Sequence, residues 1–220
     1  MSPSDEPTGF LYPFLDGAED DAGALLGELA RSARAKGTDS AATSARALDD
    51  NAAAIEAAAG AMAARLGAGG RLLTFGNGGS ATDAASLAQL FAAPPSGPPV
   101  AALDLTADVA VVTALANDVG VELVFARQLI ALARPDDVAL GVSTSGGSRN
   151  VLLALAEARA RGLVTVALVG YSGGELAQSG VVDHCLIVRS DSVHRVQEAQ
   201  AVLTVALWRA VQAHLELVGA

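Results

Sequence analysis

The chain has 220 residues, a length that suits one large domain. Apolar residues make up 51% of it and charged residues 17%, so we expect a sizeable buried core and exclude disorder of the whole chain. A net charge of −10 disfavours binding to nucleic acids and to anionic membranes, because both partners are themselves negatively charged.

The N-terminal residues and the cysteine count bear on the compartment. Cys185 is the only cysteine, so neither an internal disulfide nor a thiolate zinc site is expected. The first residues lack the basic and apolar regions of a signal peptide, and no uncharged run reaches the length of a membrane span. We therefore expect a soluble, cytoplasmic protein with no membrane partner.

Residues 1–20 form an acidic, proline-bearing leader in which residues 10–15 hold three of the eight aromatic side chains. Such a cluster indicates an arm that packs on its own chain or on a sister subunit. The alternative is a docking segment for a partner protein, because exposed aromatic residues mark contact surfaces. Residues 21–36 and 41–66 then predict two helices, separated around residues 37–40. Both are apolar on more than one face, which favours a helix-packed homodimer or homotetramer.

From residue 71 onward, short apolar runs alternate with helical stretches. Continuous apolar runs without polar alternation are typical of parallel strands covered on both faces. The predicted strands are Arg71–Phe75, Val100–Leu105, Asp137–Val142, Val164–Val169 and Asp183–Val188. The predicted helices lie near 79–92, 107–116, 120–134, 148–161, 173–179 and 193–217. The pattern predicts a three-layer, doubly wound α/β fold with a five-stranded parallel sheet. Residues 21–220 would form a single domain, with helices over 21–66 and the α/β core over 71–220.

Two glycine-rich loops follow predicted strands. The first loop, residues 76–80, reads Gly-Asn-Gly-Gly-Ser, and the second loop, residues 143–148, reads Ser-Thr-Ser-Gly-Gly-Ser. Glycines allow several backbone N–H groups to converge, hydroxyls add neutral donors, and the following helix contributes the positive end of its dipole. Hydrogen bonds to a charged group contribute about 1.5–3 kcal/mol each, so such loops can hold a phosphate without lysine.

The first loop also fits a dinucleotide-binding template. Gly76, Gly78 and Ala81 match G-x-G-x-x-A, and Asp104 follows at the distance of a ribose-binding acid. The four hydroxyls of the second loop suit a phosphomonoester better. A Walker motif is excluded, since neither loop contains Gly-Lys-Ser or Gly-Lys-Thr.

From about residue 45 to 215 the chain resembles the sugar-isomerase (SIS) domain family, and specifically its phosphoheptose isomerase branch. The resemblance is carried by GNGGSATDA at 76–84, ALAND at 114–118, FARQ at 125–128, the run from Arg134 to Ser148, GYSGGELA at 170–177 and Arg195-Val196-Gln197-Glu198. It implies a flavodoxin-like parallel sheet, a helical dimer or tetramer core, and a sugar-phosphate site between subunits. By that resemblance, the substrate contacts would be Asn77, Gly78, Gly79, Ser80, Asn117, Asp118, Ser143, Thr144, Ser145, Ser148 and Gln197.

The catalytic positions depart from the family. In the isomerase branch a His and a Glu on one helix, with a Gln and a His on the last, form a metal site. The corresponding residues here are Ser86, Leu90, Gln197 and Val205. Such a set cannot hold a divalent cation, so we expect neither a metal nor any other cofactor. His194 is the candidate general base, one turn before Gln197, and Asp83 and Asp118 are the carboxylates near the loops.

Two functions follow from these residues. The missing metal ligands favour a phosphosugar-binding protein that acts as a sensor or assembly module, similar to the family branch associated with the bacterial replication initiator. The alternative is an active aldose–ketose isomerase on sedoheptulose 7-phosphate or a similar sugar phosphate, with altered acid–base residues.

Overall fold

The computed structural model describes residues 22–219, so the aromatic segment 10–15 lies outside the described residues. The chain divides into two units between Asp39 and Ser40, and the second unit holds the α/β body. Within residues 22–219 no helix combines the length and the apolar character needed to cross a bilayer.

The first helix differs from the prediction. Helix α1 (Ala22–Gly67) is one uninterrupted helix rather than two helices separated around residues 37–40. Glycine inside a helix costs about 1 kcal/mol relative to alanine, but it neither removes an N–H nor clashes as proline would. The alanine-rich sequence on both sides of Gly37 supplies the propensity that carries the helix through this point.

Five parallel strands form the sheet, as predicted. They are β1 (Leu72–Gly76), β2 (Ala102–Asp104), β3 (Val138–Ser143), β4 (Val164–Gly170) and β5 (His184–Val188), in the spatial order β2-β1-β3-β4-β5. All residues of β1 and β3 are buried, which explains why these strands are continuous apolar runs. The order is the flavodoxin-like one, in which the chain changes direction between β1 and β3.

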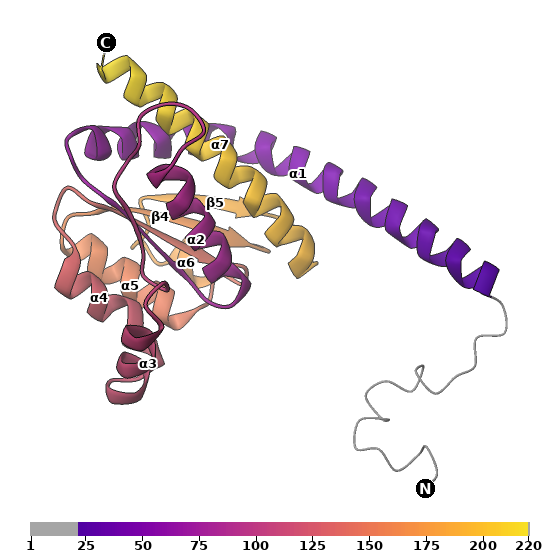
Figure 1. The fold of residues 1–220 in the computed structure, drawn as a ribbon, viewed down its shortest axis with the longest axis horizontal. Helices are drawn as coiled ribbons and strands as arrows, with labels where there is room; N and C mark the ends of the chain where they lie inside the picture. Colours follow the sequence, from indigo (N-terminus) through magenta and orange to yellow (C-terminus); the bar gives the residue numbers. More distant parts are fainter. Residues whose placement is uncertain (1–21, 220) are drawn as a thin grey trace, which may run out of the picture. The chain divides into compact units, whose positions relative to one another are not determined.

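Helices cover both faces of the sheet (Figure 1). Helices α2 (Gly79–Ala92) and α7 (Val193–Gly219) share one apolar cluster with residues 47–66 of α1. On the other face lie α4 (Val124–Leu132), α5 (Arg149–Ala160) and α6 (Gly174–Gln178). The helix expected over 120–134 is divided into the short 3-10 helix η3 (Val121–Leu123) and α4. The three-layer α/β prediction is confirmed.

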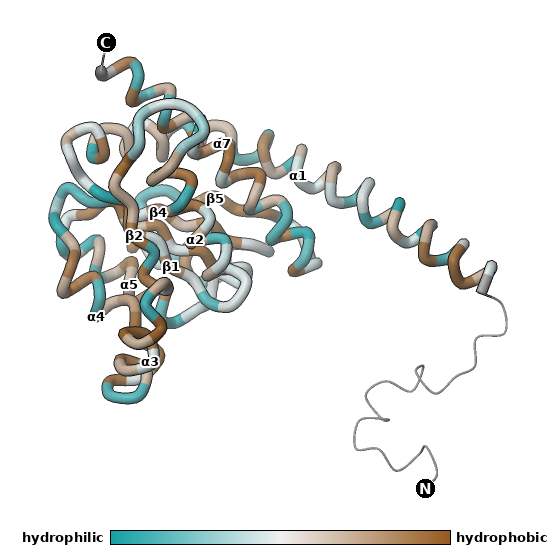
Figure 2. The backbone as a smooth tube through the Cα atoms, in the orientation of Figure 1, coloured by the Kyte–Doolittle hydropathy of each residue, from teal (hydrophilic) through white to brown (hydrophobic). Residues whose placement is uncertain are grey.

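Helix α3 (Val109–Asp118) is unusual because it is hydrophobic and yet not buried. Several of its segments are strongly hydrophobic in Figure 2, yet none of its residues is buried. It begins with an ordinary cap, in which the Asp108 carboxylate accepts hydrogen bonds from the N–H groups of Ala110 and Val111.

Candidate functional site

The two glycine loops leave neighbouring strands at the same edge of the sheet. Gly76 at the end of β1 pairs in register with Val142 of β3, so the first and second loops start side by side. This is the point between β1 and β3 where the strand order reverses, and ligands of open α/β sheets bind at such points.

The first loop makes a tight turn into α2. A Cβ at Gly76 would lie 2.6 Å from the Ser80 carbonyl oxygen, so the turn has no room for a side chain there. Gly78 has a φ of +55°, which favours glycine. Helix α2 then begins at Gly79 without a side-chain cap. The Ser80 and Ala81 N–H groups bond to the Asn77 and Gly78 carbonyls, so the N–H groups of Gly78 and Gly79 are the ones left for a ligand.

The second loop is organised by its own hydroxyls. The Ser143 and Ser148 Oγ atoms are 2.9 Å apart, and the Ser143 Oγ also accepts a hydrogen bond from the Gly146 N–H at 3.1 Å. Ser145 is exposed and accepts from the Gly147 N–H at 3.2 Å, while Thr144 is half-buried. Helix α5 starts after Ser148, whose hydroxyl makes no capping bond because it faces Ser143. The residue that precedes each of the two helices, Gly78 or Ser148, therefore makes no side-chain capping bond.

An amide pair joins the first loop to the helix that follows the second loop. Asn77 Nδ2 donates to Asn150 Oδ1 at 2.8 Å, and Asn150 Nδ2 donates to Asn77 Oδ1 at 2.9 Å. Sequence reasoning named Asn77 but missed Asn150, since no local pattern links residues 73 positions apart. The bond brings the two loops into one site.

Helix α7 reaches the same site at its first turns. A Cβ at Gly79 would lie 2.2 Å from Gln197 Nε2, so the Gln197 amide rests directly over the start of α2. His194, the candidate base, is exposed in the first turn of α7. The neighbouring Arg195 donates to the Glu198 carboxylate at 2.5 Å.

Asn117 and Asp118 are not brought to the loops in this way. They are the last residues of α3, both are exposed, and Asn117 Nδ2 donates to Asp118 Oδ1 at 2.9 Å. Within residues 22–219, no hydrogen bond joins either side chain to the first or the second loop.

Asp83 is a carboxylate with an altered pKa beside the first loop. It lies on α2 one turn beyond Gly79, and burial raises its pKa above the ordinary value. Its Oδ2 atom is buried and has no hydrogen-bond partner among the described residues. A carboxyl group in such surroundings holds a proton more readily than an exposed one does.

The positions that carry the metal ligands in the isomerase branch do not fit a metal here. Ser86 and Leu90 line an open hollow of about 560 Å³ on α2, together with alanines and Gln89. Val205 is 40% exposed and offers no donor atom. Among residues 22–219 no three His, Cys, Asp or Glu side chains lie close enough to bind an ion. A hydroxyl, an amide and two aliphatic side chains are not the ligand set of a divalent cation.

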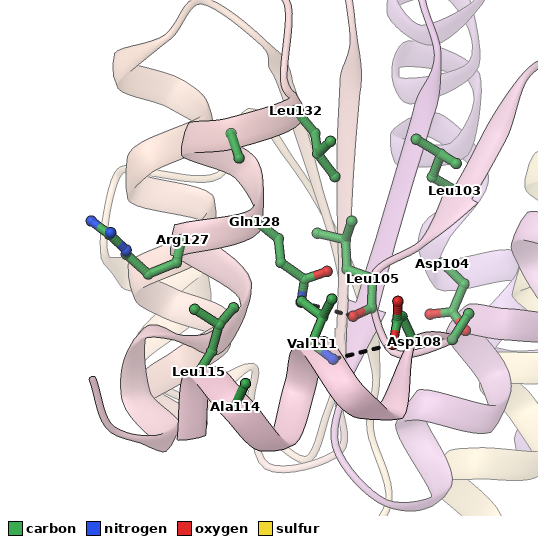
Figure 3. Close-up of a pocket in the computed structure, with 12 residues that line it drawn as sticks. Leu103, Asp104, Leu105, Asp108, Val111, Ala114, Leu115, Arg127, Gln128 and Leu132 are labelled. Atoms are coloured by element: carbon green, nitrogen blue, oxygen red, sulfur yellow. Dashed lines mark hydrogen bonds between the residues drawn. The ribbon is translucent and has the colours of Figure 1, made fainter. Parts of the chain in front are cut away.

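Figure 3 shows a second, larger cavity, which shares no residue with either loop. It has a volume of about 650 Å³ and is lined mainly by aliphatic side chains of β2, α3 and α4. Its polar groups are largely engaged with the protein: the Asp108 carboxylate caps α3, and Gln128 Nε2 donates to the Leu105 carbonyl. The lining does not suit a phosphate.

Comparisons with known proteins agree with this fold. The SIS domain family matches residues 38–170. A phosphoheptose isomerase from Solidesulfovibrio magneticus is 44% identical over 179 residues, which cover 80% of this chain and 86% of the relative. The solved phosphoheptose isomerase from Neisseria gonorrhoeae superposes with a TM-score of 0.78 at 33% identity, covering 84% of this chain and 99% of its own. The one from Francisella tularensis gives 0.73 at 33% identity, covering 82% and 98%.

Proposed function

The chain belongs to the SIS-domain family, in its phosphoheptose isomerase branch, and on that premise we propose that it isomerises a sugar phosphate held by the two loops. Sedoheptulose 7-phosphate, or a similar ketose phosphate, is the candidate substrate. The observation that carries the proposal is the pairing of the two loops through Asn77 and Asn150, next to two helix N-termini without side-chain caps.

The phosphate would be held mainly by neutral groups. Backbone N–H groups of Gly78 and Gly79 and the hydroxyls of the second loop supply hydrogen bonds, and the α2 and α5 dipoles add partial positive charge. This suits a chain with Lys36 as its only lysine. The proposed contact residues are Asn77, Gly78, Gly79, Ser80, Asn117, Asp118, Ser143, Thr144, Ser145, Ser148 and Gln197; for Asn117 and Asp118 the support is the family resemblance alone.

The reaction needs a base that moves one proton between adjacent carbons. We assign this to Asp83, a half-buried carboxylate one turn beyond Gly79 whose Oδ2 has no hydrogen-bond partner among the described residues and whose pKa is raised by burial. The base takes the proton from the carbon next to the carbonyl, which leaves an enediolate. The proton then returns to the former carbonyl carbon, while the hydroxyl proton of the first carbon moves to the other oxygen, so that the new carbonyl forms on the first carbon. The Gln197 amide, over the start of α2, would donate to the substrate oxygen that gains charge. No step passes through a metal.

The relatives named phosphoheptose isomerase favour catalysis over the sensor function that the sequence analysis put first. That earlier preference rested on Ser86, Leu90 and Val205, which exclude the family's metal but leave Asp83 in place. The sensor function becomes one outcome of the test.

The test is isotope exchange in D₂O. Sedoheptulose 7-phosphate mixed with the protein should take up deuterium at the carbon next to the carbonyl, faster than without protein. We expect Asp83→Asn to slow the uptake by about hundredfold or more, and His194→Ala to leave it nearly unchanged. The reverse result would assign the base to His194. Saturable binding without uptake would establish the sensor function, and absence of binding would refute the site.

The assembly and the compartment are further parts of the proposal. We infer a helix-packed homodimer or homotetramer in the cytoplasm, as the apolar faces of α1 suggest, with residues 10–15 as a docking segment for the chain itself or for a partner protein. Removing residues 1–20 should leave the oligomer mass unchanged if they serve a partner. Loss of the oligomer would show that they pack on a subunit.

A further inference from the structure

We propose that Asn150 is a positioning residue that acts through Asn77 to hold the first loop against the second. The inference rests on the proposed function, because it assumes that both loops contact one sugar phosphate. It concerns a residue outside the contact set and gives Asn77 a second role beside the direct substrate contact that the family resemblance implies.

The Asn77 and Asn150 side chains bond to each other reciprocally, and the orientation of both amides is defined. Each amide donates one hydrogen bond to the other, at 2.8 and 2.9 Å. Asn150 Oδ1 also accepts from the Val151 N–H at 3.0 Å, which identifies the oxygen of the Asn150 amide. That assignment in turn fixes the orientation of the Asn77 amide. One N–H and one carbonyl lone pair of Asn77 are thereby committed to Asn150.

The two partners differ in rigidity. Asn150 is only 6% exposed and stands at the start of α5, whose next residues, Val151 and Leu152, belong to a buried apolar cluster. Asn77 is exposed and precedes Gly78, which has an unusual backbone conformation. Because the buried helix is the more firmly held side, Asn150 sets the position of Asn77.

Among residues 22–219, these two bonds are the side-chain hydrogen bonds that join residues 76–80 to residues 143–150. The Ser143–Ser148 bond and the Gly146 and Gly147 bonds all stay within the second loop. The spacing between the N–H groups of the first loop and the hydroxyls of the second therefore depends on the amide pair. A phosphate that bridges the loops needs that spacing, since hydrogen bonds weaken steeply with distance and angle.

A double-mutant cycle tests the inference, with inorganic phosphate and sedoheptulose 7-phosphate as probes in titration calorimetry. If Asn150 acts through Asn77, Asn77→Ala and Asn150→Ala each weaken binding by about tenfold or more, and the double variant binds no more weakly than Asn77→Ala alone. Additive losses of about a hundredfold, or normal binding by Asn150→Ala, would overturn it. Asn51→Ala is the matched control: Asn51 is a similarly buried amide whose hydrogen bonds go to the Ala47 and Ile187 backbone and to neither loop, so its removal should leave phosphate affinity unchanged.

A second readout needs no ligand and separates this inference from the proposed function. The N–H groups of Ser80 and Ala81 bond to the carbonyls of Asn77 and Gly78, at 3.0 Å each. Asn150→Ala should speed their hydrogen exchange by about tenfold relative to Asn51→Ala, because the turn loses its anchor. If the unaltered protein binds neither probe, the proposed function fails while this exchange still decides the positioning role. Unchanged exchange would refute that role.

Discussion

The amino edge of the sheet, where the parallel strands begin, and its carboxyl edge, where they end, are built from different residues and use their hydrogen-bonding groups in opposite ways. At the amino edge, carboxylates are occupied by donors of the protein itself: the buried Asp137 accepts hydrogen bonds from the backbone and guanidinium of Arg71 and from the Arg134 N–H. Asp183 accepts from the Thr165 N–H and hydroxyl. At the carboxyl edge the loops contain glycines and hydroxyls, and the helices that follow them begin without side-chain caps.

This difference between the edges indicates that the amino edge serves stability and the carboxyl edge serves binding. A group with all its partners inside the protein has little left to offer a ligand, whereas an uncapped N–H keeps its hydrogen bond for one. Substitutions at the amino edge should therefore lower the free energy of unfolding and spare binding, whereas substitutions in the loops of the carboxyl edge should weaken binding.

The largest expected effect is at the amino edge. Asp137 is buried, so Asp137→Ala leaves the Arg71 guanidinium without its counter-ion and should lower the free energy of unfolding by about 3 kcal/mol. Urea denaturation measures the change. Asp136→Ala is the matched control, because Asp136 meets Arg65 at the exposed surface and should cost less than about 1 kcal/mol. Equal costs would show that burial does not distinguish the two pairs.

The second prediction lies at the carboxyl edge. Gly146 has a φ of +66°, and a Cβ there would lie 2.1 Å from the Gly173 carbonyl oxygen. Gly146→Ala should therefore displace the second loop, cost about 2 kcal/mol of stability and weaken phosphate binding by more than tenfold.

Gly147→Ala serves as the control for that change. Its φ is not positive, and the nearest atom to a Cβ, Ser145 Oγ, would be at an ordinary 3.8 Å. The free energy of unfolding of Gly147→Ala should therefore differ from that of the unaltered protein by less than about 1 kcal/mol. Calorimetry with inorganic phosphate separates the two variants, and the same affinity for both would mean that the loop conformation does not matter for binding.

The sheet could be predicted from the sequence because its signal is local. Each strand is a short apolar run, and parallel strands place their carboxyl ends at one edge, so the neighbourhood of the two loops followed from the predicted fold. The continuity of α1 through Gly37 was missed, since a glycine near polar residues resembles a helix end.

The details that complete the site depend on contacts without a local signature. The Asn77–Asn150 pair joins residues far apart in the chain, and the Asp83 pKa is raised by packing that no sequence pattern reveals. Asn117 and Asp118 show the converse. Their motif is recognisable, but the end of α3 sets their position, and that helix buries none of its residues.

The smallest expected effect is a difference in pH dependence between the two edges. Burial alone would raise the pKa of Asp137, but hydrogen bonds from Arg71 and the Arg134 amide outweigh it and hold the pKa below the ordinary value. The pKa of Asp183 is lowered in the same way, because hydrogen bonds from Thr165 and Arg159 outweigh the effect of burial. The unfolded chain binds protons first, at a pKa of about 3.9, so the stability from these carboxylates is present above that pH and is lost as pH falls through their folded pKa.

The contribution of Asp83 to stability should change with pH in the opposite direction. Its folded pKa is raised, so the folded chain binds the proton more tightly, and stability falls as pH rises from about 3.9 to the folded pKa of Asp83. Asp83→Asn removes this loss of stability, so the variant should gain stability relative to the unaltered protein across this window. Asp137→Asn should instead reduce the loss of stability that occurs as the pH falls below about 3.9. Urea midpoints from pH 7 to pH 3 measure both. If the urea midpoint of Asp83→Asn changes with pH in parallel with that of the unaltered protein, the buried Oδ2 has a hydrogen-bond partner in solution. That result would contradict the assignment of Asp83 as the base.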